Sequence, residues 1–516
     1  MNTQSVVVIG AGIGGIAAAA HLAQRGMHVT VFEKNSRPGG RCGSFTRDGH
    51  RFDTGPTLLV MPRVYEAEFA ALGAPLSDCL TLQRVDPTYR LVFDDGSDLA
   101  LTSDMKRMCD QLEAIEPGSF AGFLRYLAEG RRHYDLAMDR LVDRDFRKLT
   151  DFFNFANLPL LFQVKPLARH YRNMGAYFTQ PRLKAAFTFQ DVYMGLSPFE
   201  AAATFSLMPF SELAHGVWYP EGGMYRVVEA LVDIATLAGV EFVYNAPVER
   251  IEVHDDQTSG IHLADGQFVK ADAVVANADL PYVYRDLLPD AAEADRLARK
   301  RFSCSAISFF WGVGKTYPAL GPHTLFLADN YRENFDDIID RLTLPDNASL
   351  YVYAPARLDP TAAPEGADTL IAVVPVGHID EGNEQDWPGI RDRARQAVFE
   401  RLRLLGITDL ETHLKFEVNY TPLSWRKRYN LLKGATHGLS HTLMQLGYLR
   451  PHNQHARYGN LYFVGASTHP GTGVPTAMIG ARQVAQRVSE RLGQTYPQRT
   501  PQSVGGLKQG VRASHS

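Results

Sequence analysis

The order of hydrophobic and polar positions near the start of the chain predicts a strand, a turn, a helix and a second strand. A β-branched run at 6–9 ends in a cluster of glycines, and an alanine-rich helical stretch then continues to Arg25, where Gly26 follows. A second apolar run ends at Glu33. Strands buried in a parallel sheet form continuous apolar runs, so these two strands are expected to lie side by side.

Further along, the pattern separates a helical part from a strand-rich part. Residues 64–203 are mostly helical in pattern, with prolines as breaks. Asp-Gly pairs at 95–96 and 265–266 predict hairpins. Between 300 and 450, short apolar runs favour a largely antiparallel sheet that is either covered on both faces or lines an apolar cavity. The expected strands there are 306–313, 350–354, 370–376 and 413–420, with a helix at 387–405.

The glycine cluster after the first strand has the spacing of a dinucleotide-binding turn. Gly10 lets the chain turn off the strand, Gly12 and Gly14 keep the backbone free of side chains, and Gly15 lets the helix pack on the strand. The helix N-terminus adds partial positive charge for a pyrophosphate. Glu33 is placed to accept both ribose hydroxyls of an adenosine, and it would repel a 2′-phosphate, which disfavours NADP.

The next segment favours FAD over NAD. Lys34 leads into a glycine pair and an arginine, and Gly40 and Arg41 are expected to close over the phosphate and ribityl part of the cofactor. This pattern of glycines, Glu33 and Arg41 resembles the flavin-dependent amine oxidase and desaturase superfamily. The resemblance implies that the turn formed by Gly55 and Pro56 lies close to the isoalloxazine ring, where a side chain would be in the way. The alternatives are a surface turn with a solvated arginine for the first feature and an ordinary loop for the second.

A second cluster of candidate cofactor contacts lies near the end of the chain. A strand leads into a Gly-Pro loop, and Pro475 stands where a first helical residue is favoured. The N-terminus of this helix would stabilise negative charge at the flavin N1 and C2 carbonyl. His469 is explained better as a packing or flavin-contact residue than as an acid or base. The candidate contacts are Gly465, Thr472, Gly473 and Val474, together with Val248, which is expected against the adenine edge.

These segments predict an α/β fold, in which a Rossmann-like FAD-binding domain of the GR2 flavoprotein type carries an inserted α+β substrate domain. The FAD-binding domain is expected to be discontinuous. It would comprise 1–70, 220–300 and 455–493, with 71–219 and 301–454 as the substrate and membrane-associating domain and 494–516 as a disordered tail. The returning strand near 271–279 has no second glycine motif, so the electrons are expected to come from an organic substrate rather than from NAD(P)H.

Composition and charge narrow the list of partners. A net charge of −4 provides no field for nucleic acid. The four cysteines lie far apart without CxxC spacing, which indicates neither a disulfide framework nor a metal site. The sequence has no charged leader before the first strand, so we expect a cytoplasmic protein. No acid or base can be singled out as catalytic.

Residues 146–186 combine clustered aromatic and apolar side chains with an excess of positive charge. Within the segment only Asp151 is a counter-charge. Such a helical segment suits the interface of an anionic membrane, but a buried helix pair with a solvated basic edge explains it equally well. The basic residues are Arg147, Lys148, Lys165, Arg169, Arg172, Arg182 and Lys184.

Three further stretches, 216–231, 421–451 and 460–475, together with the N-terminal motif resemble the CrtI-type phytoene desaturases, the bacterial and fungal carotenoid desaturases of the flavin amine oxidase superfamily. The resemblance implies noncovalent FAD, a long-chain isoprenoid polyene as substrate, and peripheral attachment to a membrane. Ala466 and Ser467 stand where the superfamily often has an acid, as the desaturases commonly show. Without a hydrophobic anchor at the C-terminus, the membrane contact is expected to be superficial.

The resemblance further implies that hydride transfer to flavin introduces double bonds into C40 phytoene or C30 diapophytoene, with oxygen or a quinone as electron acceptor. A carotenoid isomerase, ketolase or terminal oxidase of the same family would share every motif. A flavin amine oxidase would need an aromatic cage, for which Trp218 and Tyr219 are candidates. A flavin-binding protein without turnover is a third class.

Overall fold

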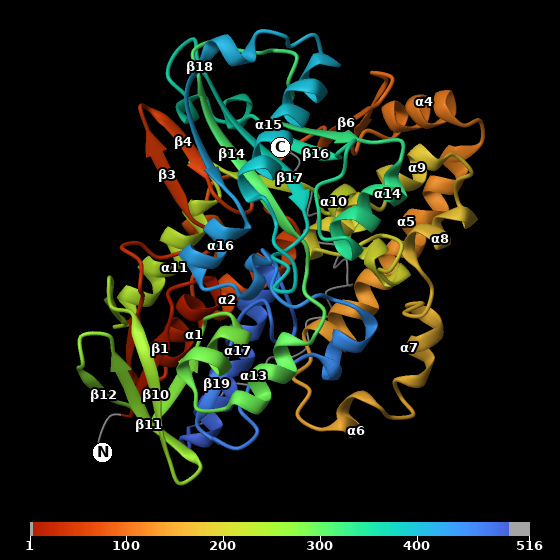
Figure 1. Ribbon diagram of the computed structural model, residues 1–516. Coiled ribbons are helices and arrows are strands. Elements are labelled where there is room, and N and C mark those ends of the chain that lie inside the picture. Colours follow the sequence, from red (N-terminus) through yellow and green to blue (C-terminus); the bar gives the residue numbers. More distant parts are fainter. Residues whose placement is uncertain (1–3, 495–516) are drawn as a thin grey trace, which may run out of the picture.

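The structure, a computed structural model, describes residues 4–494. Figure 1 shows a parallel sheet with its helices in the lower part of the molecule, a larger sheet above it, and a group of helices on the right. Except for Gln494, the tail that the sequence predicts to be disordered lies outside the described residues. The domain boundaries given above stay a prediction.

The two ends of the sequence meet in a five-stranded parallel sheet with the order β19-β13-β1-β2-β9. Val8 of the middle strand pairs with Val31 on one side and with Val275 on the other. The predicted strand, turn, helix and parallel strand are therefore confirmed. The strands are β1 (Ser5–Ile9), β2 (His28–Phe32), β9 (Glu241–Val243), β13 (Ala273–Ala276) and β19 (Leu461–Phe463).

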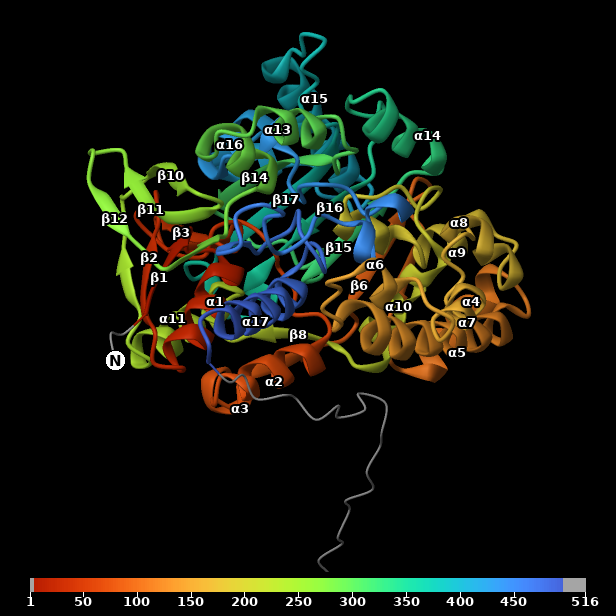
Figure 2. The same ribbon diagram turned by 90° about the horizontal axis from the view of Figure 1, so that it is seen from below.

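Helices and a small sheet cover both faces of the parallel sheet. Helix α1 (Ile13–Ala23) is buried along its whole length because it packs against the sheet, α11 (Tyr225–Leu237) and α17 (Val474–Arg491). Figure 2 shows α1 and α17 side by side. The other face packs against antiparallel strands and short helices. These are β10 (Val248–His254), β11 (Gln257–Leu263), β12 (Phe268–Lys270), α12 (Leu280–Tyr282) and α13 (Ala291–Ala298).

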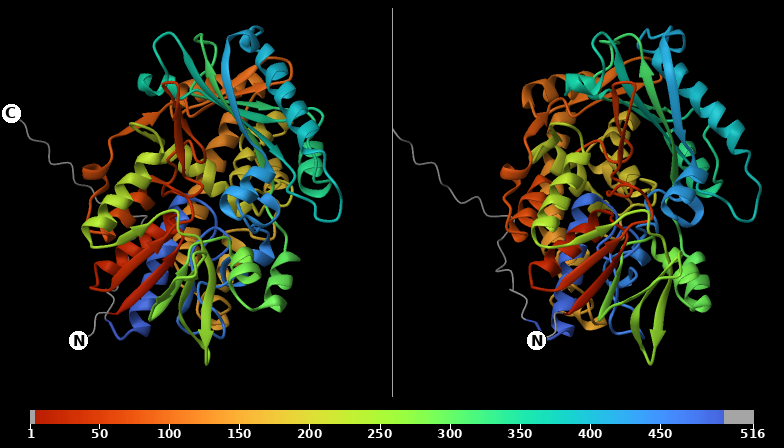
Figure 3. Two further views of the ribbon diagram at one scale, coloured as in Figure 1. Left: turned by 60° about the vertical axis from the view of Figure 1, so that its left-hand side comes forward. Right: turned by 90° about the vertical axis from the view of Figure 1, so that its left-hand side faces the viewer.

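The larger sheet has seven strands in the order β18-β14-β17-β16-β15-β6-β7, and Figure 3 shows it above the parallel sheet. It is antiparallel as predicted, except for the parallel pair β15 and β6. Strand β15 was not predicted, although it is fully buried and apolar from Leu325 to Leu327. Helix α15 (Trp387–Arg403) covers one face, where the Trp311 and Phe399 rings stack 5.4 Å apart. The strands are β6 (Tyr89–Phe93), β7 (Asp98–Leu101), β14 (Ser305–Val313), β15 (His323–Leu327), β16 (Leu350–Tyr353), β17 (Asp368–Val376) and β18 (Leu414–Tyr420).

The predicted helical part is confirmed, but its basic and aromatic segment is not a regular helix. Prolines at 159, 166 and 181 divide it into short pieces, because proline removes a backbone donor and restricts the residue before it. The long helices α4 (Met105–Ile115) and α5 (Ser119–Ala137) precede the segment and α10 (Leu207–Ala214) follows it. The pieces are α6 (Leu149–Phe152), α7 (Leu158–Gln163), α8 (His170–Asn173) and α9 (Pro181–Ala186). Within residues 4–494, no helix is long and apolar enough to cross a lipid bilayer.

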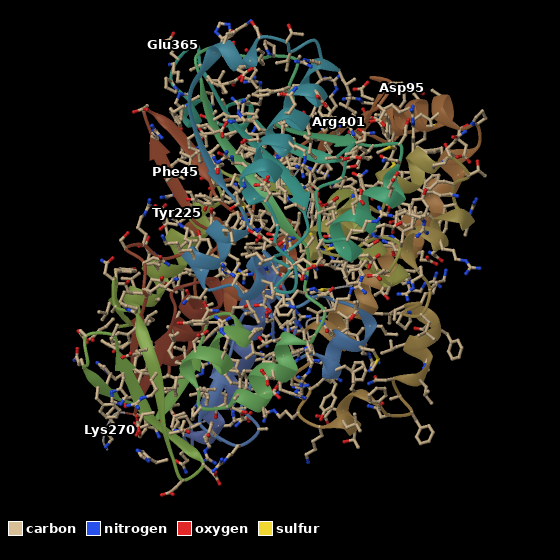
Figure 4. The ribbon with its side chains drawn as sticks, viewed as in Figure 1. Phe45, Asp95, Tyr225, Lys270, Glu365 and Arg401 are labelled. Carbon is tan, nitrogen blue, oxygen red and sulfur yellow. The ribbon has the colours of Figure 1, made fainter. Side chains whose placement is uncertain are left out.

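Two small ribbons connect the large sheet to the rest of the fold. Phe45 of the first ribbon, labelled in Figure 4, lies with its ring 5.4 Å from that of Phe310 in β14. The ribbons pair β3 (Ser44–Arg47) with β4 (His50–Asp53), and β5 (Leu82–Val85) with β8 (Val217–Pro220). The remaining helices are α2 (Pro62–Ala71), α3 (Leu76–Cys79), α14 (Tyr331–Phe335) and α16 (Pro422–Tyr429).

A buried ion pair in the large sheet provides a test of the fold. Arg357 donates from both terminal nitrogens to the fully buried Asp368 carboxylate, each at 2.7 Å, and the Tyr317 amide donates to the same group. Substitution R357M leaves this charge buried without its partner and should lower the free energy of unfolding by about 3–5 kcal/mol. Denaturant unfolding measures the change. In the control K106M, which removes the exposed pair Lys106–Asp110, the unfolding midpoint should not move. Equal midpoints for R357M and the parent would contradict the assignment.

Candidate functional site

A cavity of about 670 Å³ lies where the carboxyl ends of the parallel strands face the seven-stranded sheet and the helical insert. Gly10, Glu33 and Asn277, at the ends of β1, β2 and β13, form part of its wall. Ser308 of β14 and Tyr351 of β16 line it from the large sheet. Ligands of open α/β sheets bind beyond the carboxyl ends of the strands. This cavity is therefore the candidate site.

The two glycine segments near the start of the chain are directly joined. Gly12 and Gly39 form a parallel bridge, and the Gly39 amide donates to the Ala11 carbonyl at 2.7 Å. A Cβ on Gly40 would lie 3.4 Å from the Cα of Gly12. Helix α1 starts after Gly12 without a side-chain cap, so no side chain competes with a ligand for its first amides. This cradle fits the pyrophosphate of a dinucleotide.

Glu33 lies beside this turn and is almost fully buried. Its Oε2 accepts the Ala11 amide at 2.8 Å, and its Oε1 accepts the backbone and side-chain N–H groups of Asn35 at 2.8 and 2.7 Å. A carboxylate offers about four acceptor positions, so three hydrogen bonds leave room for a ligand hydroxyl. The carboxylate therefore has the position and the capacity that the sequence predicted for a ribose contact.

The C-terminal motif reaches the same cavity from the opposite side. Helix α17 starts after Gly473, whose φ of +119° favours glycine, and it also has no side-chain cap. Its second residue is Pro475, one position later than predicted. The Thr472 amide donates to His441 Nε2 at 3.1 Å, which fixes the loop before the helix. The uncapped helix N-terminus points positive partial charge at the cavity, as a flavin that becomes anionic on reduction would require.

The structure brings nearly all the predicted contact residues together. Gly15 is the exception, because it lies behind the turn: a Cβ there would come to 2.2 Å from the Gly10 carbonyl oxygen, so its part is close packing. His469 also lies outside the wall, and its Nε2 is 2.7 Å from the Arg144 carbonyl, as expected of a packing residue. The predicted residues that line the cavity are Gly10, Gly12, Gly14, Glu33, Lys34, Gly40, Arg41, Gly55, Pro56, Val248, Gly465, Thr472, Gly473 and Val474.

Several polar residues of the wall were not predicted. Asp279 accepts the Ser467 hydroxyl at 2.7 Å and the Leu432 amide at 3.1 Å, and burial raises the pKa of its carboxyl group while nearby Arg41 opposes the shift. Arg41 donates to the Thr436 carbonyl at 2.8 Å. Burial lowers the pKa of the neighbouring His437 to about 4. The signals available in the sequence were the polar residues at 277–279, at the end of the predicted returning strand, and at 436–441, within one of the stretches that carry the family resemblance.

Beyond the cradle the cavity is lined mainly by apolar and aromatic side chains. They come from the large sheet, from α14 and from the helical insert, and they include Tyr89, Phe189, Tyr193, Leu325, Tyr331, Phe335, Met138, Phe205 and Met208. Trp218 and Tyr219, the candidates for an aromatic cage, are not part of the wall. Tyr219 is fully buried among side chains of the large sheet. The cavity thus joins a cradle for a dinucleotide to a chamber suited to hydrocarbon.

Known proteins are similar to this sequence over most of its length. A family described as flavin containing amine oxidoreductase matches residues 13–489. A "zeta-carotene-forming phytoene desaturase" from Myxococcus xanthus is 44% identical over 485 residues, which are 94% of this chain and 93% of that protein. The chain belongs to the flavin amine oxidoreductases, in their carotenoid desaturase branch. Two further members are a "Phytoene desaturase" from Fusarium fujikuroi (40% identity, 95% of this chain and 90% of that protein) and a "4,4'-diapophytoene desaturase (4,4'-diaponeurosporene-forming)" from Staphylococcus haemolyticus (32%, 94% and 99%).

Solved structures of low sequence identity show the same fold. An oxidoreductase from Methanosarcina mazei superposes with a TM-score of 0.64 at 15% identity, over 94% of this chain and all of that chain. A putrescine oxidase bound to putrescine gives 0.63 at 15% identity, over 95% of this chain and 99% of that chain. These structures confirm the predicted Rossmann-like fold with an inserted α+β domain. As a member of the family named above, this protein is an FAD-dependent oxidoreductase.

The buried carboxylate at the end of β2 provides a test of the cradle. Substitution E33Q places an amide N–H against one of the backbone donors that now bind the carboxylate. We expect FAD to bind about 10- to 100-fold more weakly, the equivalent of one lost hydrogen bond to a charged group. Titration of the apoprotein with FAD, followed by absorbance, measures the change. The matched control is E241Q on the neighbouring strand, whose carboxylate is exposed and is not part of the cavity wall. Equal affinities for E33Q and the parent would show that Glu33 does not contact the cofactor.

Proposed function

We propose that this protein is an FAD-dependent carotenoid desaturase that introduces double bonds into a long-chain isoprenoid polyene. The observation that carries the proposal is the cavity, which connects the dinucleotide cradle with a chamber of apolar and aromatic side chains. A saturated C–H bond of a hydrocarbon offers no polar group for recognition, so binding must rest on burial of apolar surface. The named relatives act on phytoene or diapophytoene, which supports a C40 or a C30 polyene as substrate.

The residues of the chamber position the polyene and exclude water. FAD, when bound, supplies the hydride acceptor. On one side the polyene is held by Leu325, Tyr331 and Phe335. The backbone turn at Gly55 and Pro56 brings no bulky side chain between substrate and cofactor. A Cβ on Gly55 would lie 1.9 Å from the Arg41 carbonyl oxygen, which explains the glycine. Holding reacting carbons in a dry, fixed geometry contributes to the rate by lowering the entropy cost of reaction.

Other reactions of the same family stay as alternatives. A carotenoid isomerase, ketolase or terminal oxidase would use the same cradle and the same apolar chamber. An amine oxidase is disfavoured, because neither Trp218 nor Tyr219 faces the cavity. For the electrons that leave the cofactor we propose oxygen or a quinone as acceptor, since the strand that ends at Asn277 carries no second dinucleotide motif.

Conversion of defined polyenes tests the activity. The FAD-loaded protein is incubated in liposomes with phytoene, diapophytoene or lycopene, with oxygen or with a quinone under anaerobic conditions. We expect phytoene or diapophytoene to gain absorption at longer wavelengths because each new double bond extends the conjugation. Lycopene serves as the control for a terminal oxidase. If phytoene and diapophytoene stay unchanged while lycopene is oxidised, the desaturase proposal is wrong.

We further propose that the segment 146–167 contacts a membrane surface. Its side chains Phe155, Phe162 and Leu167 are 90%, 83% and 75% exposed. In Figure 4 side chains extend outward from α6 and α7 at the lower right. Several large apolar side chains exposed within one short segment indicate an interaction site, and lipid is the partner that suits the hydrocarbon substrate.

The basic residues contribute less to this surface than the sequence suggested, and the expectation that only Asp151 opposes them is wrong. Arg147 lies 2.8 Å from Asp145 and 2.5 Å from Glu490, and Arg182 pairs with Asp95 and Asp329. Lys165 forms an ion pair with Glu129. Asp145 directly precedes the segment, whereas the other acids come from distant parts of the chain, and a count within the segment could reveal none of them. Lys148, Arg169 and Arg172 stay exposed beside the apolar side chains.

The exposed phenylalanines test the membrane contact. A double variant, F155S/F162S, removes apolar area that would enter the lipid and should reduce cosedimentation with anionic liposomes at least tenfold, at unchanged FAD content. The control L237S removes an equally exposed apolar side chain, 89% exposed at the end of α11, and should bind liposomes like the parent. If the double variant also binds like the parent, this segment is not the contact.

A further inference from the structure

A chain of hydrogen bonds leads from the cavity wall to a buried acid. Tyr193 and Tyr89 both line the chamber. The Tyr193 hydroxyl donates to the Tyr89 hydroxyl, and the Tyr89 hydroxyl donates to Glu212 Oε1 at 3.4 Å. On the far side, Gln190 Nε2 donates to Glu212 Oε2 at 3.1 Å. The hydrogen bonds therefore run from Tyr193 through Tyr89 to one oxygen of the Glu212 carboxyl group, while Gln190 donates to the other oxygen. The Tyr193 oxygen donates its proton to Tyr89, so its lone pairs are available to accept a proton from the chamber.

The residues of this hydrogen-bonded chain come from three different elements. Tyr89 begins β6, Gln190 and Tyr193 lie on the short helical turn Phe189–Met194, and Glu212 lies on α10. Glu212 is 3% exposed and lies among apolar side chains, where an ionisable group without a basic partner is costly. A side chain of this kind that hydrogen bonds connect to a substrate cavity is a candidate for function.

We propose that Glu212, reached through Tyr89 and Tyr193, takes up the proton that the polyene releases during desaturation. The inference rests on the proposed function, because only a reaction that removes a hydride and a proton needs such an acceptor. The C–H bond that donates the proton breaks, and its electron pair becomes the second bond of the new double bond. The proton binds the Tyr193 oxygen while the Tyr193 proton moves to Tyr89 and the Tyr89 proton moves to Glu212 Oε1. Atoms and charge therefore balance, with the hydride leaving to FAD.

The surroundings of Glu212 set the pH range in which this relay operates. Burial raises the pKa of its carboxyl group to about 8, although the bonds from Gln190 and Tyr89 oppose the shift. The titratable groups that face it are Tyr89, Tyr193 and, from α5, Tyr126, and burial keeps the pKa of each well above its usual value. Because only the carboxylate form accepts a proton, the rate should rise as the pH increases through about 8.

The experiment compares pH profiles of initial desaturation rates for FAD-loaded protein in liposomes with phytoene or diapophytoene. Substitution E212Q keeps the size of the side chain but cannot accept the proton, so the rate should fall at least about tenfold and the rise near pH 8 should disappear. Y193F breaks the first link and should lower the rate similarly. The conservative E212D should retain a pH-dependent rise. The control Y126F removes a hydroxyl near Glu212 that donates to the Phe187 carbonyl and lies outside the cavity wall, and its profile should match that of the parent.

A second measurement does not depend on turnover. Infrared difference spectra between acidic and alkaline pH should show a protonated carboxyl band in the parent that is absent in E212Q. A slow E212Q variant that keeps the rise near pH 8, or one with an unchanged rate, would overturn the relay and leave Glu212 a structural role. If the parent converts none of the polyenes, the proposed function fails and the relay fails with it. Thermal unfolding and FAD content of each variant separate these outcomes from misfolding.

Discussion

The close approach of three strand ends to one asparagine side chain is the constraint on which the site depends. The backbone N–H of Asn277 donates to the Ile9 carbonyl at 2.7 Å, and the side-chain Nδ2 of Asn277 donates to the Val464 carbonyl at 2.8 Å. A Cβ on Gly12 would come to 2.6 Å from the Asn277 Oδ1. Asn277 therefore joins β1, β13 and β19 at their carboxyl ends. Since the two halves of the cradle follow β1 and β19, their spacing is fixed by this contact rather than by either loop alone.

A buried arginine has a similar part on the C-terminal side of the cavity. Arg450 donates only to backbone carbonyls, those of Leu439, Ser440, Gln445, Ala466 and Thr468. Burial lowers the pKa of its guanidinium to about 9, so the group is still charged at neutral pH. Its planar fork of donors satisfies carbonyls that would otherwise be buried without partners. It thus holds the loop that carries His441 against the loop that carries Ser467, and both loops border the cofactor cradle.

Features of the site that depend on residues nearby in the sequence could be predicted, and features that depend on residues far away in the sequence could not. The glycine turn, Glu33 and the Gly-Pro loop were predictable because each depends on neighbours within one strand–turn–helix unit. Asn277 and Arg450 were visible in the sequence, but their roles depend on pairing between β1, β13 and β19, which no local pattern specifies. The same reason explains the basic segment, where Glu490, 343 positions away, forms an ion pair with Arg147. Strand β15 was missed because its apolar part, Leu325 to Leu327, is too short to give a period that separates strand from helix.

The two ends of the cavity differ in charge, and this difference separates cofactor binding from substrate binding. At the cradle, the carboxyl groups of Glu33 and Asp279 lie in the same wall as Lys34 and Arg41, whose charges, with the N-termini of α1 and α17, suit a diphosphate and a reduced flavin. The chamber beyond holds few polar groups, and those of Tyr89 and Tyr193 are bonded to each other and to Glu212. The binding of an uncharged hydrocarbon does not depend on the electrostatic potential at the cradle. The protein can therefore tighten its hold on the cofactor through charge without changing its affinity for the polyene, which depends on apolar area and shape alone.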